Sequence, residues 1–150
     1  MDRKVVIIPT YNEKENIEAI VRKVFSLEGE YNVLIIDDGS PDGTAAIVKK
    51  VQTEFPERLF LIERSGKLGL GTAYLTGFKW ALENGYDYIF EMDADFSHNP
   101  EDLPRLYKAC AECGGVAIGS RYCDGISVVN WPIGRIIMSY YASVYVRTVL

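Results

Sequence analysis

The sequence predicts an α/β fold in which a mostly parallel sheet is flanked by helices on both faces. Short, uninterrupted apolar runs alternate with segments whose apolar residues recur at helical spacing, and unbroken apolar strands are typical of buried parallel sheets. Polar clusters follow the apolar runs, as expected where ligands bind beyond the carboxyl ends of parallel strands. The 150 residues are 48% hydrophobic and 25% charged, which suits one globular domain with a sizeable core.

The first part of the chain predicts two strand–helix pairs. Residues 5–8 form an apolar run that Pro9 ends, and residues 33–36 form a second run that leads into a dense turn signal. Between these runs Asn12 is expected to cap a helix, with Glu15 at its third position, because the pair fits a capping box. The apolar stripes of the two helices are Ile17, Ile20, Val21 and Val24, then Ile47, Val48 and Val51.

The alternation continues in the middle of the chain. Residues 59–62 and 88–90 are predicted to be the third and fourth strands, with a third helix between them. Asn99-Pro100 is expected to open a fourth helix, because proline is tolerated at the first helical position, where its missing N–H is not needed. The apolar residues 116–118 are predicted to form a fifth strand.

The C-terminal part has a different character. Residues 131–150 show a helical pattern that is apolar over much of its circumference and rich in tyrosine, and Arg135 and Arg147 leave no clean run that could span a membrane. Two interpretations stay open, a helix that packs on the domain and an amphipathic helix at a bilayer surface. We expect a domain over residues 1–125 and this amphipathic helix over residues 126–150. The pattern stops without a helix stop signal, which indicates a piece of a longer chain.

Charge and cysteine usage limit the functional classes. The net charge of −5 argues against a nucleic-acid partner, which would require a basic face. The first apolar run is too short for a signal peptide, so we expect a cytoplasmic protein with reduced cysteines. A zinc site at Cys110 and Cys113 is not expected, because no second Cys/His pair accompanies them.

Asp93-Ala-Asp95 is the most informative motif. Its two carboxylates follow the predicted fourth strand, so they would present oxygen ligands at the edge of the sheet. A hard divalent cation, Mg²⁺ or Mn²⁺, takes one or two such carboxylates and completes its shell with substrate phosphates. That arrangement can hold a nucleotide diphosphate and stabilise it as a leaving group. The pattern alone is common in solvated turns, so its meaning depends on the other strand ends.

The other strand ends carry residues that suit the remainder of a nucleotide sugar. Tyr11 can stack on a base, Glu13 can accept hydrogen bonds from base or ribose, and Asp38 can bind base N–H groups. Lys67 lies in a glycine-rich turn and can bring a cation near phosphates, and Arg121 can pair with a phosphate bidentately. Because these strand ends converge on one edge, they indicate a single site.

Five motifs at these strand ends can be compared with known families. They are Pro9-Thr-Tyr-Asn-Glu13, Asp37-Asp-Gly-Ser-Pro-Asp-Gly-Thr44, Lys67-Leu-Gly-Leu-Gly-Thr-Ala-Tyr74, Asp93-Ala-Asp-Phe-Ser-His98 and Gly119-Ser-Arg-Tyr122. Together they resemble the dolichol-phosphate (polyprenol-phosphate) mannose synthases, which are inverting family 2 glycosyltransferases. The resemblance implies a GT-A catalytic domain, a Rossmann-like, nucleotide-binding three-layer sandwich, over residues 1–125.

The resemblance also implies roles for individual residues. Asp93 and Asp95 would hold Mg²⁺ or Mn²⁺ on the diphosphate, the Ala94 backbone would lie beside the sugar, and Arg121 would meet a phosphate. Asp95 and Arg121 are the residues expected to act in catalysis. The residues implied in contacts with the guanosine of GDP-mannose are Pro9, Tyr11, Glu13, Ile36 and Asp38.

The implied reaction transfers mannose from GDP-mannose to a polyprenyl or dolichyl monophosphate with inversion. The acceptor phosphate is already anionic at neutral pH, so no strong general base is required and His98 has no compulsory role. Such an enzyme is expected at a membrane surface, peripheral on the cytosolic face of a plasma membrane or endoplasmic reticulum. Two alternatives stay open, a polyprenyl-phosphate glucose synthase that uses UDP-glucose and a non-catalytic nucleotide-sugar binding module.

Overall fold

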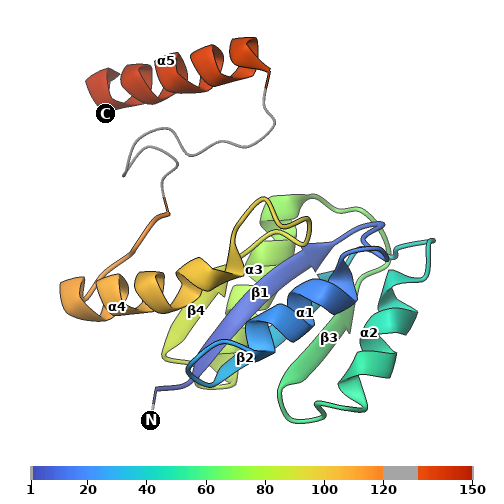
Figure 1. Cartoon of the computed structure of the whole chain (residues 1–150). Coiled ribbons are helices and arrows are strands. Elements are labelled where there is room, and N and C mark those ends of the chain that lie inside the picture. Colours follow the sequence, from blue (N-terminus) through green and yellow to red (C-terminus); the bar gives the residue numbers. More distant parts are fainter. Residues whose placement is uncertain (1, 120–131, 150) are drawn as a thin grey trace. The chain divides into compact units, whose positions relative to one another are not determined.

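The computed structural model describes residues 2–119 and 132–149. It divides into two compact units, one that runs to Ala117 and one that begins at Ile118, and each is described here by itself (Figure 1). The domain boundary predicted at residue 125 lies outside the described residues and stays a prediction.

The first unit is built on a parallel sheet. Within the described residues this sheet has four strands in the order β3-β2-β1-β4, so the two strands nearest the N-terminus lie in its centre. All three strand pairs are parallel, which brings the carboxyl ends of the strands to one edge. The predicted α/β class and its four strands are therefore confirmed. The strands are β1 Lys4–Thr10, β2 Tyr31–Asp37, β3 Leu59–Glu63 and β4 Tyr88–Glu91.

Helices cover both faces of this sheet (Figure 1). Side chains alternate between the faces of a strand, so each central strand contributes to two separate core clusters. Val6 and Ile8 of β1 pack with α1, α2 and α4, whereas Val5 and Ile7 pack with α3, and all four are fully buried. The helices are α1 Ile17–Phe25, α2 Thr44–Gln52, α3 Leu70–Glu83 and α4 Leu103–Cys113.

A glycine lets α3 approach the sheet closely. A Cβ atom at Gly77 would lie 2.7 Å from Cγ2 and 2.8 Å from Cδ1 of Ile7, a fully buried residue of the central strand. Any larger residue at position 77 would therefore have to displace the core. The close approach seats α3 on the sheet and holds its first turn near the carboxyl edge.

α1 begins later than predicted, because the loop after β2 competes for the backbone of the expected cap. Asn16, not Asn12, precedes the helix. Asn12 has a left-handed φ of 62°, and its N–H donates to Ser40 Oγ at 3.0 Å. The N–H groups of the next two residues donate in the same way to Thr44 Oγ1 and Asp42 Oδ2. These bonds tie the loop after β1 to the loop after β2, and the helix starts only beyond them.

The predicted fifth strand is wrong. In the part of the chain that the structure describes, residues 116–118 pair with no strand, and Val116 and Ile118 are 84% and 81% exposed. Residues 88–90, an apolar run of the same length, do form a strand, because β1 pairs with their backbone. No described strand pairs with residues 116–118 in this way. In the described sheet β4 pairs with β1 alone.

The helix predicted at Asn99-Pro100 is confirmed. The Asn99 side chain accepts a hydrogen bond from the Glu101 N–H at 3.1 Å, and Pro100 begins a short 3₁₀ turn, η1 Pro100–Asp102, that leads into α4. α4 carries Cys110 and Cys113 as free thiols. It ends at Gly114, whose φ of 63° is the left-handed conformation that commonly terminates a helix.

The second unit contains the described helix α5 Ile133–Val149. Large apolar side chains around this helix are exposed, among them Tyr141 and Tyr145 at 67% and 68%. The helix predicted in the C-terminal part of the chain is thus confirmed over the range of α5. In the part of the chain that the structure describes, every helix is too short or too polar to cross a bilayer.

Candidate functional site

A cavity of about 230 Å³ lies at the carboxyl edge of the sheet. The segments that follow β1, β2, β3 and β4 all contribute to its walls, together with the first turn of α3. Most predicted site residues thus meet at one place, as the convergence of parallel strand ends requires. The cavity is lined by Pro9, Thr10, Tyr11, Glu13, Asp38, Lys67, Leu70, Ala73, Asp93, Ala94 and Asp95.

Two predicted site residues are not among those that line the cavity. Ile36 is fully buried in the core cluster between the sheet and α3. A contact between Ile36 and a ligand would therefore have to come from its main chain. Arg121 lies outside the described residues. The roles predicted for both residues stay predictions.

The wall after β1 combines an aromatic ring with a cation. Tyr11 is 38% exposed, and Lys67 Nζ lies 4.7 Å from the centroid of its ring. Glu13 is half-buried, and its carboxylate accepts a hydrogen bond from the Asn16 side chain at 3.1 Å. This wall can therefore offer a flat apolar surface, a hydrogen-bond acceptor and a positive charge to one ligand.

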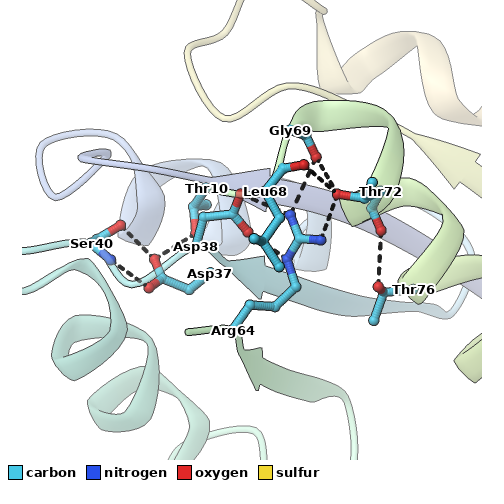
Figure 2. Close-up of polar contacts among 9 residues, drawn as sticks. All are labelled: Thr10, Asp37, Asp38, Ser40, Arg64, Leu68, Gly69, Thr72 and Thr76. Atoms are coloured by element: carbon cyan, nitrogen blue, oxygen red, sulfur yellow. Dashed lines mark hydrogen bonds and ion pairs between the residues drawn. The ribbon is translucent and has the colours of Figure 1, made fainter. Parts of the chain in front are cut away.

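The two adjacent aspartates at the end of β2 have different surroundings (Figure 2). Asp37 is 1% exposed. It accepts hydrogen bonds from Thr10 Oγ1 at 2.9 Å, from the Ser40 N–H at 2.9 Å and from Ser40 Oγ at 2.6 Å. Asp37 therefore holds two loops together, while its neighbour Asp38 lines the cavity.

Asp38 is held by Arg64, a residue that the sequence analysis did not select as a site residue. Arg64 Nε donates to Asp38 Oδ1 at 2.6 Å, and Nη2 donates to Oδ2 at 2.8 Å. Both side chains are only 9% exposed. The register between β2 and β3 brings this pair together. Asp37 lies opposite Glu63, and Asp38 and Arg64 are the residues that directly follow these two. Single-sequence patterns do not give that register.

The loop after β4 orients two carboxylates. Asp95 accepts a hydrogen bond from the Ser97 N–H at 2.9 Å. Hydrogen bonds from the Ser97 backbone and hydroxyl hold the pKa of Asp95 below its usual value, so this carboxylate is ionised at neutral pH. Asp93 Oδ1 lies 3.5 Å from the hydroxyl of Tyr74 on α3. Burial and the charge of Asp93 raise the pKa of Tyr74, which therefore remains a proton donor.

His98 contacts its own loop. Its Nδ1 accepts a hydrogen bond from the Asp93 N–H at 3.2 Å. The same nitrogen lies 3.8 Å from Asp93 Oδ2. The local role that the sequence left open for His98 agrees with this geometry.

The carboxylates of Asp93 and Asp95 fit a divalent cation. The described residues contain no group of three or more His, Cys, Asp or Glu side chains that could hold a metal. Mg²⁺ and Mn²⁺ do not require such a group when substrate phosphates supply the remaining oxygens. Both carboxylates line the cavity, so a metal held there would lie where a diphosphate can reach it.

Sequence comparison now assigns the family. The profile of Glycosyl transferase family 2 matches residues 5–147. The chain belongs to this family. Three mannosyltransferases are similar to this family 2 chain, and it spans less than two thirds of the length of each. They are the polyprenol monophosphomannose synthase of Mycolicibacterium smegmatis (47% identity over 99% of this chain and 56% of the relative), the undecaprenyl-phosphate mannosyltransferase of Micrococcus luteus (44%, 99% and 60%) and the dolichol-phosphate mannosyltransferase of Pyrococcus furiosus (40%, 89% and 37%).

Solved structures confirm the GT-A fold of this family 2 chain. The mannosyltransferase PcManGT from Pyrobaculum calidifontis, in complex with GDP-Man and Mn²⁺, has a TM-score of 0.65 and 28% identity. The match covers 73% of this chain and 32% of PcManGT. Residues 1–349 of TarS from S. aureus match with a TM-score of 0.61 at 24% identity, over 73% of this chain and 32% of that one, and support the fold alone.

Proposed function

We propose that this family 2 glycosyltransferase chain transfers mannose from GDP-mannose to a polyprenyl monophosphate, with inversion at C1 and release of GDP. The observation that supports this most is the meeting of an aromatic ring, a cation and several carboxylates in one cavity at the sheet edge. The names of its relatives add support, because all three are mannose transferases of polyprenol-type lipids. PcManGT, which shares the fold, was solved with GDP-Man and Mn²⁺.

We infer that the nucleoside binds near the ends of β1 and β2. Tyr11 would stack on the guanine ring, and Glu13 and Asp38 would accept hydrogen bonds from the base or ribose. Pro9 lines the same wall. Stacking is tolerant of the base, so selectivity for guanine would have to come from the hydrogen bonds with the carboxylates.

The diphosphate would lie between Lys67 and the loop after β4. Asp93 and Asp95 would hold Mg²⁺ or Mn²⁺, which stabilises the negative charge that develops on the leaving diphosphate. Ser97 fixes the Asp95 carboxylate through its N–H, and the Tyr74 hydroxyl lies beside Asp93, so both are oriented before a ligand arrives. The Ala94 backbone would lie next to the sugar.

The transfer itself needs little beyond positioning and charge stabilisation. An oxygen of the lipid phosphate attacks C1 of mannose, and the bond between C1 and the diphosphate oxygen breaks with its electron pair leaving on GDP. The attacking oxygen is already anionic, so no residue of this chain has to remove a proton. Arg121 would pair with a phosphate, and its guanidinium suits that contact.

A transfer assay tests this proposal. The full chain is incubated with Mn²⁺, a polyprenyl phosphate and either GDP-mannose or UDP-glucose. We expect lipid-linked mannose from GDP-mannose and no product from UDP-glucose. Turnover of UDP-glucose instead would contradict the proposed donor, and nucleotide binding without any transfer would identify a binding module.

We propose further that the chain works at the cytosolic face of a membrane, with α5 in the interface. The polyprenyl acceptor is a lipid whose phosphate lies at the bilayer surface. α5 combines exposed aromatic and aliphatic side chains, including Tyr141 and Tyr145, with few charges. Amphipathic helices with aromatic and cationic residues lie in the plane of the interface with their apolar side chains among the lipids, and we propose this placement for α5.

Vesicle flotation tests the interfacial helix. Tyr141→Asp/Tyr145→Asp in the full chain is expected to reduce partitioning onto phosphatidylcholine–phosphatidylglycerol vesicles by about 100-fold, because each of the two rings that leave the interface forfeits about 1.5 kcal/mol. The matched control is Leu75→Asp/Leu82→Asp on α3, whose side chains are similarly exposed at 59% and 68%. Equal flotation of the two double variants would contradict the assignment of α5.

A further inference from the structure

We propose that Arg64 is a positioning residue that fixes the Asp38 carboxylate and the turn before α3 as one unit, and so sets how the donor's base and diphosphate are recognised together. This inference rests on the proposed function, because it places a nucleoside diphosphate in the cavity. It goes beyond that function in assigning a role to a residue that does not line the cavity.

One guanidinium connects three segments of the chain (Figure 2). In addition to its two bonds with Asp38, Arg64 donates from Nη1 to Thr72 Oγ1 at 2.8 Å and from Nη2 to the Gly69 carbonyl at 3.3 Å. The Thr72 hydroxyl in turn lies 2.7 Å from the same carbonyl. The ends of β2 and β3 and the first turn of α3 are thus held by one side chain.

The turn that Arg64 holds forms part of the cavity wall. Lys67 and Leu70, on either side of this turn, both line the cavity. Gly69 adopts φ 98° and ψ 148°, a conformation that only glycine adopts readily. Because many other conformations are also open to glycine, this turn keeps one conformation only when its surroundings fix it. Here the bonds from Arg64 and Thr72 to the Gly69 carbonyl do so.

The charge balance of the cavity also requires Arg64. Four carboxylates line the cavity, and Lys67 is the one Lys or Arg among its described lining residues. A nucleoside diphosphate is itself anionic, so these carboxylates oppose its entry unless cations offset them. Arg64 neutralises Asp38, whose side chain is 9% exposed and would otherwise be a poorly solvated charge. The four carboxylates are those of Glu13, Asp38, Asp93 and Asp95.

Lysine cannot replace this arrangement. Arg64 uses Nε, Nη1 and Nη2 at the same time, in the planar fork of a guanidinium. A lysine ammonium keeps the charge but has a single nitrogen, so it cannot hold Asp38 bidentately and reach Thr72 as well. Arg22 offers a matched control, because it also pairs bidentately, with Glu54 at 2.9 and 2.8 Å, but is 41% exposed and does not line the cavity.

Calorimetric titration of the full chain with GDP and with UDP, each with Mn²⁺, tests the role. We expect Arg64→Lys to weaken GDP binding about tenfold and Arg64→Ala about 100-fold, since the latter leaves a nearly buried carboxylate unpaired. The preference between GDP and UDP should shrink in both variants. Arg22→Lys should change neither affinity. Methylguanidinium added at millimolar concentration should restore part of the GDP affinity of Arg64→Ala.

The outcomes separate this inference from the proposed function. Failure of the unmutated chain to bind GDP would overturn both. If the unmutated chain binds GDP and both Arg64 variants keep its affinity and preference, the positioning role alone is wrong. Equal loss of GDP and UDP affinity, with a lower unfolding temperature and no rescue by methylguanidinium, would reduce Arg64 to a structural residue and overturn the inference as well. If Arg64→Ala does not fold, the test rests on Arg64→Lys, through its affinity for GDP and its preference between GDP and UDP.

Discussion

Asp95→Ala is expected to abolish the metal dependence of GDP binding, with a loss of more than about 100-fold in affinity in the presence of Mn²⁺. Substituting residues that merely support a metal ligand already costs about 10- to 100-fold, and a directly bound carboxylate should contribute more. Of the four carboxylates among the described lining residues of the cavity, the proposal assigns two to the metal, Asp93 and Asp95. Without one of them the cation would be held mainly by the diphosphate.

The fold should survive this substitution. Asp95 is exposed and accepts a hydrogen bond from Ser97 in its own loop, so we expect a change in stability below about 1 kcal/mol. Titration of GDP with and without Mn²⁺ measures the effect. The control is Asp102→Ala, which removes a half-exposed carboxylate that pairs with Arg105 and does not line the cavity. A metal-dependent affinity that Asp95→Ala leaves intact would exclude Asp95 as a ligand.

The parts of the fold that could be predicted from the sequence are those with local causes. The four strands are unbroken apolar runs because both faces of the sheet are buried, and this pattern is visible in one dimension. The start of α1 has a nonlocal cause, since Ser40 and neighbouring side chains take up the N–H groups of residues 12–14. Residues 116–118 have the composition of a strand but pair with no strand among the described residues, and a local sequence pattern cannot indicate whether a partner strand is present.

The same distinction applies to the candidate site. The sequence predicted that Tyr11, Asp38 and Asp93 would meet, because parallel strand ends share an edge. It also selected Asp38 and not Asp37 as a site residue, and Asp38 is the one that lines the cavity. Successive side chains of a strand point to opposite faces, so at the end of β2 one carboxylate turns toward Thr10 and Ser40 and the other toward Arg64. Which of the two lines the cavity depends on the neighbouring strands.

This difference between the two aspartates leads to the last prediction. Asp37→Ala is expected to lower the free energy of unfolding by about 3 kcal/mol. It removes the acceptor of three hydrogen bonds, from the Thr10 hydroxyl and from the Ser40 N–H and hydroxyl. Water cannot easily take its place as an acceptor, because Asp37 is almost fully buried. Urea denaturation followed by circular dichroism measures the change. Asp37→Asn should lie in between, since its amide keeps one accepting oxygen.

Asp87→Ala is the matched control for Asp37→Ala. Asp87 also accepts a backbone hydrogen bond, from the Arg3 N–H at 2.8 Å, but it is exposed. Water can replace its carboxylate as an acceptor, so we expect a loss below about 1 kcal/mol. Equal losses in the two variants would mean that the three bonds to Asp37 do not hold the loops together. A loss confined to Asp37→Ala would establish that the first aspartate of the motif stabilises the edge of the sheet on which Asp38 faces the cavity.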